Sequence, residues 1–261
     1  MFEFHKDKQR YFEMQAENAE QYVIPFIEEA FPVKPGMRIL EIGCGEGGVL
    51  KAFVEKGLTG VGVELVEERL VNAREFMKNE LAAGKVTFIS KDIYDVNAAQ
   101  EFGGEFDIIV LKDVIEHIFE QKKLISRLKN FLKPGGVIYF GFPPWQMPFG
   151  GHQQICRNKL LANMPYYHLL PKSIYKGILN LAKQPSKELL EIKETGISIE
   201  RFERIVKECD YKILHYTHYL VNPIYRYKFG WKARKQAGII KAIPWVRNFF
   251  TTCVYYLIAV K

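Results

Sequence analysis

Short apolar runs alternate with helical segments along residues 37–142, and this alternation constrains the fold more than any other feature of the sequence. The apolar runs are residues 37–42, 59–65, 85–90, 106–112 and 137–142, and the segments with helical periodicity are residues 46–56, 67–84 and 117–132. Strands that alternate with helices at this spacing are joined by right-handed crossovers and form a parallel sheet. Because each apolar run is nearly continuous, we expect helices on both faces of that sheet.

Outside this region the sequence predicts a helix, an insertion and two more strands. A helix is expected from residue 6 to about residue 30. Residues 145–197 are rich in Pro, Tyr and Leu without a strand period, and we interpret them as an inserted, partly helical cap. Ser198 is a good N-cap for a helix over residues 199–210. Residues 211–221 and 251–260 then predict an antiparallel pair of strands at the sheet edge.

The predicted fold is therefore α/β, with a seven-stranded, mostly parallel sheet, an antiparallel final strand pair and a cap inserted after the fifth strand. We expect four parts along the chain: a helical segment at 1–34, a core at 35–144, the cap at 145–197, and the C-terminal part of the core at 198–261 with a basic excursion at about 223–250.

The segment LEIGCGEGG, residues 40–48, joins the first strand to the next helix and fits two cofactor fingerprints. Its glycines match the G-x-G-x-x-G of dinucleotide-binding folds, and from Glu41 to Gly47 it also matches the E-x-G-x-G-x-G of S-adenosylmethionine enzymes. A dinucleotide would bring its pyrophosphate beside Glu41 and Glu46. A pair of like charges about 4 Å apart costs roughly 4 kcal/mol at an effective dielectric constant of about 20. S-adenosylmethionine has no phosphate and carries an ammonium group, so the charges of this loop favour it.

Acidic residues also follow the second and third strands. Glu64 ends the second strand, where a carboxylate can accept hydrogen bonds from ribose hydroxyls. Asp92 follows the third strand, where it can accept a hydrogen bond from the adenine amino group, with Ile93 near the ring. With the segments LEIGCGEGG, GVELVEERL, ISKDIYDV, FDIIVLKDVIEHI and LKPGGVIYFGFP in this order over roughly residues 35–145, the chain resembles the class I S-adenosylmethionine-dependent methyltransferases, close to their type 11/12 small-molecule branch.

The resemblance implies a Rossmann-like fold, S-adenosylmethionine as cofactor and S-adenosylhomocysteine as product. It also implies which residues contact the cofactor. Glu41, Gly43 and Gly45 would line its methionine end, Glu64 the ribose, Asp92 and Ile93 the adenine, and Lys112, Asp113 and Val114 the loop beside the sulfonium. Cys44 and Leu65 are further expected cofactor contacts.

Methyl transfer requires a nucleophile held about 3–3.5 Å from the methyl carbon in a dry pocket, and a hydroxyl acceptor also benefits from a general base. His117 in DVIEHI and His152 in PFGGHQQ are the catalytic candidates, because each follows the carboxyl end of a predicted strand, where ligands bind in such sheets. Both have a structural alternative: His117 can fix the start of a helix or pair with Glu116, and His152 can be a hydrogen-bonded hinge of the cap.

Aromatic residues of the predicted cap could form a wall for the acceptor or simply the core of the cap. They are Trp145, Phe149, Tyr166 and Tyr167, together with His168. The four cysteines, Cys44, Cys156, Cys209 and Cys253, are far apart and form no C-x-x-C pair. We therefore predict neither a disulfide framework nor a metal site.

Charge is concentrated near the C-terminus, where nine basic residues and no acidic residue follow Asp210. The excursion at about 223–250 mixes these basic residues with Trp, Tyr and Phe, and three interpretations are open: contact with an anionic membrane surface, nucleic-acid binding, or a solvated segment packed on its own domain. The final apolar run has 12 residues, too few to span a membrane. The charged N-terminal segment shows no signal peptide, so a cytoplasmic location is expected.

The sequence thus predicts a methyltransferase that uses S-adenosylmethionine to methylate an oxygen of a small-molecule or lipid-linked acceptor. An RNA methyltransferase is the alternative enzyme, but KDVI stands after the fourth strand where an NPPY-like tetrapeptide would favour amino methylation. A cofactor-binding module without catalytic activity is the non-enzymatic alternative.

Overall fold

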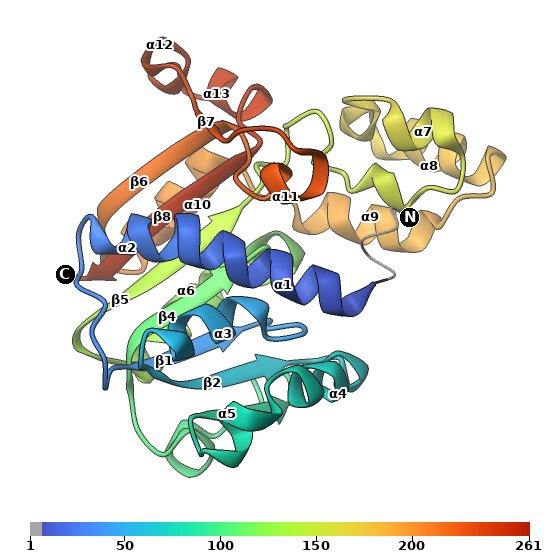
Figure 1. The fold of residues 1–261 in the computed structure, drawn as a ribbon. Helices are drawn as coiled ribbons and strands as arrows, with labels where there is room; N and C mark the ends of the chain where they lie inside the picture. The colour runs from blue at the N-terminus through green and yellow to red at the C-terminus, as the bar shows by residue number, and fades with distance from the viewer. Residues whose placement is uncertain (1–6) are drawn as a thin grey trace.

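The structure is a computed structural model that describes residues 7–261, and the predicted helix start at residue 6 lies outside the described residues. Its strands form a mixed sheet in the order β3-β2-β1-β4-β5-β8-β6-β7 (Figure 1). The parallel strands are β1 (Arg38–Ile42), β2 (Thr59–Glu64), β3 (Val86–Ser90), β4 (Phe106–Lys112) and β5 (Leu132–Phe142). The antiparallel strands are β6 (Tyr211–Val221), β7 (Arg234–Lys235) and β8 (Cys253–Val260).

The predicted α/β class, the parallel sheet and the final antiparallel pair are confirmed, but the strand count is corrected from seven to eight. The extra strand is the two-residue β7, which pairs antiparallel with the outer edge of β6. It lies inside the basic excursion, where so short a pairing leaves no alternating pattern in the sequence. The strand β8 inserts between β5 and β6, pairing antiparallel with both.

Helices cover both faces of the sheet, as the continuous apolar strands predict. On one face lie α1 (Lys8–Asn18), α2 (Ile24–Glu28), α3 (Gly48–Glu55) and α4 (Glu67–Phe76), packed on strand residues such as Ile39 and Val110. On the other lie α6 (Gln121–Arg127) and α10 (Ile199–Glu208), packed on residues such as Leu40 and Ile109. Figure 1 shows α1, α2 and α3 in front of the sheet and α6 and α10 behind it.

Three predicted helices differ from those in the structure. The helix from residue 6 to about 30 is divided into α1, a π-helical stretch Ala19–Val23 and α2, where Pro25 lies in the first turn and has no N–H to donate. The helix over 67–84 breaks at Met77, whose φ of −114° and ψ of 27° separate α4 from α5 (Lys78–Ala82). The helix over 117–132 begins at Gln121, after a 3₁₀ turn over Ile115–His117, and ends in a second 3₁₀ turn over Leu128–Phe131.

Residues 143–197, between β5 and α10, carry the helices α7 (Lys159–Asn163), α8 (Lys172–Leu181) and α9 (Ser186–Thr195). They have a small apolar core of their own, which includes Cys156, Leu161, Tyr167 and Tyr175. The Ser198 side chain accepts a hydrogen bond from the Arg201 N–H and caps α10, as predicted. This insertion is the cap expected after the fifth strand.

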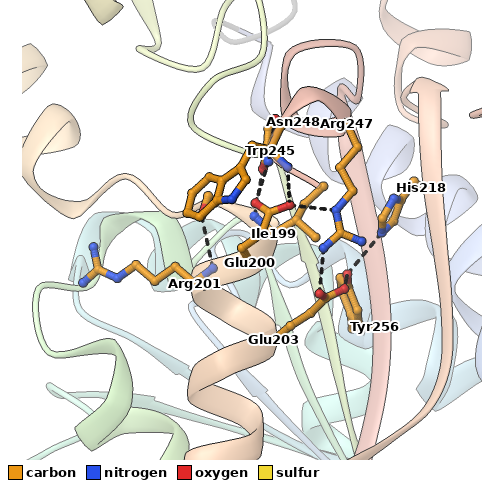
Figure 2. Close-up of polar contacts among 10 residues, drawn as sticks. Ile199, Glu200, Arg201, Glu203, His218, Trp245, Arg247, Asn248 and Tyr256 are labelled. Carbon is orange, nitrogen blue, oxygen red and sulfur yellow. Dashed lines mark hydrogen bonds and ion pairs between the residues drawn. The ribbon is translucent and has the colours of Figure 1, made fainter. Parts of the chain in front are cut away.

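The basic excursion, residues 223–250, contains α11 (Tyr225–Phe229), β7, α12 (Gly238–Lys241) and α13 (Val246–Phe249). A polar network anchors it to α10 (Figure 2). Arg247 donates from Nε to Glu200 Oε1 at 2.8 Å and from Nη2 to Glu203 Oε2 at 2.7 Å. Asn248 Nδ2 donates to Glu200 Oε2 at 2.7 Å, and the Tyr256 hydroxyl donates to Glu203 Oε1 at 2.7 Å. The excursion is therefore fixed to the domain at α13.

Three further features follow from the arrangement of the described residues. None of their helices combines the length and the apolar character that crossing a membrane requires. The final apolar run is the strand β8, as predicted. All four cysteines are buried free thiols.

Candidate active site

The glycine loop leaves β1 in a tight turn that only small residues permit. Gly43 has a φ of +69°, and a Cβ atom placed on it would lie 2.5 Å from Val114 Cγ2. The N–H groups of Gly43 and Cys44 both donate to the Val63 carbonyl, at 2.7 and 3.1 Å. These contacts hold the loop against the ends of β2 and β4, so residues from three strands meet around one corner.

A cavity of about 90 Å³ lies at this corner. Its lining includes the predicted cofactor residues Glu41, Gly43, Cys44, Gly45, Lys112 and Asp113. It also includes Tyr11, Phe12 and Gln15 of α1, which were not among the predicted site residues. The helix α1 lies directly on the loop, since a Cβ atom at Gly48 would be 2.4 Å from the Phe12 carbonyl oxygen.

Glu41 is a buried carboxylate that faces this cavity. Its side chain is 3% exposed, and Oε2 has no hydrogen-bond partner among the described residues. Burial raises the pKa of Glu41 to about 8, although the Leu50 N–H and the Lys112 ammonium lower it in part. An ammonium group placed in the cavity would supply the missing partner, and the contact of Glu41 with the methionine end of S-adenosylmethionine stays a prediction.

Glu64 holds the loop in place from the end of β2. Its Oε2 accepts from the Gly45 N–H at 2.9 Å, and its Oε1 accepts from the N–H groups of Leu65 and Val66 at 2.8 and 3.1 Å. The side chain of Leu65 is 68% exposed beside it.

Asp92 and Ile93 follow β3, which pairs in parallel with β2 through Glu64 and Ser90. Asp92 is exposed and its Oδ1 accepts from the Tyr94 N–H at 2.9 Å, whereas Ile93 is buried. These residues and Leu65 lie outside the lining of the 90 Å³ cavity, along the same edge of the sheet. Their contacts with the adenosine part of the cofactor remain predictions.

Lys112 and Asp113 connect the end of β4 to α1. Lys112 Nζ lies 2.6 Å from Asp113 Oδ2 and donates to Gln15 Oε1 at 3.1 Å. Burial lowers the pKa of Lys112, but the charge and hydrogen bond of Asp113, together with Tyr11 and Cys253, outweigh it and raise that pKa above its usual value. Asp113 has a φ of +56°, a conformation that costs energy in a residue other than glycine and is common at functional sites.

The structure brings the two predicted catalytic histidines together. His117 ends the 3₁₀ turn after β4, and His152, with a φ of +52°, follows β5 in the turn that begins the cap. Their ring centroids are 5.0 Å apart. Burial, and then the nearby His117, lower the pKa of His152 to about 4, so its imidazole is uncharged at neutral pH.

A second cavity, of about 290 Å³, lies between the turn after β4 and the cap helix α9. His117 and Phe119 line one side, and Glu188, Glu191, Ile192 and Thr195 line the other. His117 therefore connects the predicted catalytic pair with a space large enough for an acceptor group.

The aromatic residues predicted to form the acceptor wall line neither of these two cavities. Trp145 packs edge-on against His168 at 4.7 Å, and the Tyr166 hydroxyl donates to the Phe249 carbonyl at 3.0 Å. Tyr167 is 5% exposed and belongs to the core of the cap, while Phe149 is 38% exposed. The structure itself thus supplies packing partners for three of them, and their role toward an acceptor stays a prediction.

Comparisons with known proteins identify the family to which this chain belongs. A family profile described as a methyltransferase domain matches residues 15–164, more than half of the chain. A ubiquinone biosynthesis O-methyltransferase of Pseudomonas aeruginosa is 29% identical over 104 residues, which are 40% of this chain and 43% of that protein. The matched stretch thus spans less than half the length of this curated relative.

Solved structures share the fold over nearly the whole chain. An S-adenosylmethionine-dependent methyltransferase from Clostridium acetobutylicum superposes with a TM-score of 0.58 at 15% identity, covering 94% of this chain and 92% of that one. A magnesium protoporphyrin IX methyltransferase from Synechocystis, solved with S-adenosylhomocysteine, gives 0.55 at 15% identity, covering 100% and 89%. Since the family profile extends from α1 through the glycine loop and the β4 turn into the cap, the chain belongs to the class I S-adenosylmethionine-dependent methyltransferases.

Proposed function

We propose that this methyltransferase methylates a hydroxyl oxygen of a small-molecule or lipid-linked acceptor that binds between the turn after β4 and α9. The observation that carries the proposal is the position of His117, which lines the 290 Å³ cavity while its ring lies 5.0 Å from that of His152. The O-methyltransferase relatives are named for ubiquinone biosynthesis, and their similarity to this chain, although partial, is consistent with an oxygen acceptor.

Bound S-adenosylmethionine supplies an electrophilic methyl group, so the residues of this chain have to bind, orient and exclude water. The Glu41 carboxylate would meet the ammonium group, since its Oε2 has no hydrogen-bond partner among the described residues. Lys112 and Asp113 are held by each other and by Gln15, which fixes the turn where the methyl group is expected. Tyr11, Phe12 and Gln15 of α1 line the cavity, where they would exclude water once the cofactor is bound.

Activation of the acceptor hydroxyl depends on the two histidines. A neutral imidazole can accept the hydroxyl proton directly, or it can hold a cation that lowers the pKa of the hydroxyl. Both routes require His117 and His152 in their uncharged form, which the low pKa of His152 provides at neutral pH.

The test is incubation of the full chain with methyl-labelled S-adenosylmethionine and a fractionated cell extract. We expect label in the lipid or small-molecule fraction, as an ether that resists the alkaline treatment that hydrolyses esters, and a loss of about 100-fold or more in His117→Ala and His152→Ala. The matched control is His215→Ala, which removes a histidine that pairs with Glu29 far along β6. Label confined to RNA, or full turnover in both variants, would reject the proposal.

We also propose that the basic excursion contacts an anionic membrane surface, which would present a lipid-linked acceptor to the cap. The excursion exposes large apolar side chains, among them Trp231 at 60%, Ile239 at 75% and Trp245 at 58%. Lys232, Arg234 and Lys235 lie on the same segment, which has no acidic residue. Apolar and basic side chains that occur together on a surface are typical of segments that lie in the membrane interface.

A further inference from the structure

The turns after β4 and β5 bring three metal-ligating side chains together. Glu116 and His117 belong to the 3₁₀ turn after β4, and His152 follows β5. Because β4 and β5 are parallel neighbours, paired at Lys112 and Gly141, their following turns emerge at the same edge of the sheet. One ligand atom from each of the three residues lies within 4.8 Å of the others.

Glu116 carries the second, independent observation. Its side chain is 4% exposed, and neither carboxylate oxygen has a hydrogen-bond partner among the described residues. The charge of the nearby Lys112 ammonium is already matched by Asp113 at 2.6 Å. A buried carboxylate without a donor is strongly disfavoured, because it has given up its hydration and gained no partner in exchange. A cation between Glu116 and the two imidazoles would remove that cost.

We propose that Glu116, His117 and His152 bind a divalent transition-metal ion such as Zn²⁺. One carboxylate and two neutral imidazoles are a ligand set found in catalytic zinc sites, which keep a further coordination position open. Imidazole ligands favour zinc and similar ions over Mg²⁺, which prefers oxygen ligands. The left-handed backbone of His152, at a φ of +52°, is a strained conformation that turns this residue into the cluster and fits a functional constraint.

This site would give the enzyme its means of activating the acceptor, an inference that rests on the proposed O-methylation. His117 lines the 290 Å³ cavity, so the open coordination position would face the acceptor. A hydroxyl oxygen bound there has a lowered pKa and releases its proton to solvent. That oxygen then forms a bond to the methyl carbon as the methyl–sulfur bond breaks, and the electron pair of the broken bond stays on sulfur.

Metal binding by the tag-free full chain tests the site without reference to activity. After dialysis against a chelator, Zn²⁺, Co²⁺ and Mg²⁺ are titrated calorimetrically, and the absorption spectrum of the Co²⁺ form reports the coordination geometry. We expect about one equivalent of Zn²⁺ to bind, with the intensified visible bands of a four- or five-coordinate Co²⁺ site, and at least about 100-fold weaker binding of Mg²⁺. No tight Zn²⁺ binding would overturn the proposal.

Two variants locate the ion. Glu116→Gln keeps the shape of the side chain and removes its charge, so the protein should fold while the Zn²⁺ affinity falls by at least about tenfold. His152→Ala should have a similar effect, whereas His215→Ala, distant from the cluster, should leave the affinity unchanged. Unchanged Zn²⁺ binding in both Glu116→Gln and His152→Ala would overturn the assignment, because the ion would then lie elsewhere.

Activity measurements separate this inference from the proposed function. Transfer of label to a hydroxyl acceptor that stops in chelator and returns with Zn²⁺ or Co²⁺ supports both. Transfer that continues unchanged in chelator rejects the role of the metal while the proposed O-methylation stands. One equivalent of Zn²⁺ at the cluster, with label found only in nitrogen or carbon products, rejects the proposed function and leaves the metal site in place.

Discussion

The cofactor-free fold disfavours the charged form of Glu41, which the ammonium group of the cofactor should favour. Because burial raises its pKa to about 8, the folded protein binds this proton more tightly than the unfolded chain does. The associated stability is fully present below the ordinary pKa of glutamate, about 4.3, and is lost progressively as the pH rises to about 8. Glu41→Gln removes this loss. We therefore expect the variant to gain about 3–4 kcal/mol in unfolding free energy, relative to the wild type, between pH 5 and pH 8.

Urea unfolding of the cofactor-free protein at the two pH values measures that gain, and calorimetry measures the cost in function. The affinity for S-adenosylhomocysteine should fall at least about tenfold in Glu41→Gln, since the ammonium group loses its carboxylate. Glu55→Gln, at an exposed position of α3, is the control for a change of one charge. An unfolding free energy that changes equally with pH in wild type and Glu41→Gln would show that Glu41 is ionised in the free protein.

At the scale of single elements, the contact between α1 and the glycine loop depends on Gly48. A Cβ atom there would lie 2.4 Å from the Phe12 carbonyl oxygen and 2.7 Å from Gln15 Cβ, so Gly48→Ala must displace α1. We expect a loss of about 1–3 kcal/mol in unfolding free energy, as in other overpacked sites, together with weaker cofactor binding. Chemical denaturation and calorimetry measure the two effects.

Gly177→Ala is the matched control for this substitution. Gly177 lies inside α8, and a Cβ atom placed on it would meet no atom outside its own helix within 4 Å. Alanine should therefore stabilise the helix by about 0.5–1 kcal/mol and leave cofactor binding unchanged. If Gly48→Ala and Gly177→Ala had the same effect on cofactor affinity, α1 would not form a wall of the binding site.

The attachment of the excursion depends on Arg247. Its side chain is 12% exposed and bonds both Glu200 and Glu203, so Arg247→Ala leaves two carboxylates of α10 without their cation (Figure 2). We expect a loss of about 3 kcal/mol in unfolding free energy and faster hydrogen exchange in α13. Arg204→Ala, which removes an exposed ion pair on the same helix, should cost less than about 0.5 kcal/mol. Equal losses in the two variants would mean that the network does not hold the excursion.

Elements with a strong local pattern were predictable from the sequence, and elements set by distant packing were not. The strand 106–112 matches its predicted bounds because it is an apolar run with clear ends. The strand 211–221 matches its predicted bounds as well. The break at Met77 was not predictable, since that residue leaves the helical conformation while fully buried and helix propensity does not register such packing.

The same distinction applies to the candidate site. Glu41 and Gly43 could be predicted because the strand, the loop and the helix are contiguous in the sequence. The cover provided by α1 could not, because an amphipathic pattern does not say which surface it will meet. Neither could the cluster of Glu116, His117 and His152, since its two histidines are far apart in the sequence and the pairing of β4 with β5 brings them together.

At the scale of the whole molecule, basic residues lie at both ends of the sheet, and only one end is expected to meet a membrane. Lys232, Arg234 and Lys235 lie in the excursion, beside exposed apolar side chains. Lys34, Lys56 and Lys85 are exposed too, but they precede β1, β2 and β3 at the opposite end. Figure 1 places α12, α13 and β7 at the upper end of the molecule, far from the starts of β1 and β2.

Two triple variants with equal net charge therefore separate a docking surface from a general effect of charge. Replacing Lys232, Arg234 and Lys235 with Gln should weaken binding to vesicles of anionic phospholipid by about 3 kcal/mol, or roughly 100-fold, at about 1 kcal/mol for each basic residue near the surface. Replacing Lys34, Lys56 and Lys85 with Gln should change it by less than about threefold, because these lysines lie beyond a Debye length of about 8 Å from the membrane. Co-sedimentation at low and high salt measures both. Equal losses of vesicle binding in the two variants would show that binding follows net charge alone. If the wild-type protein does not bind these vesicles, the docking surface is rejected, because the exposed tryptophans and basic residues would then not act together at a membrane.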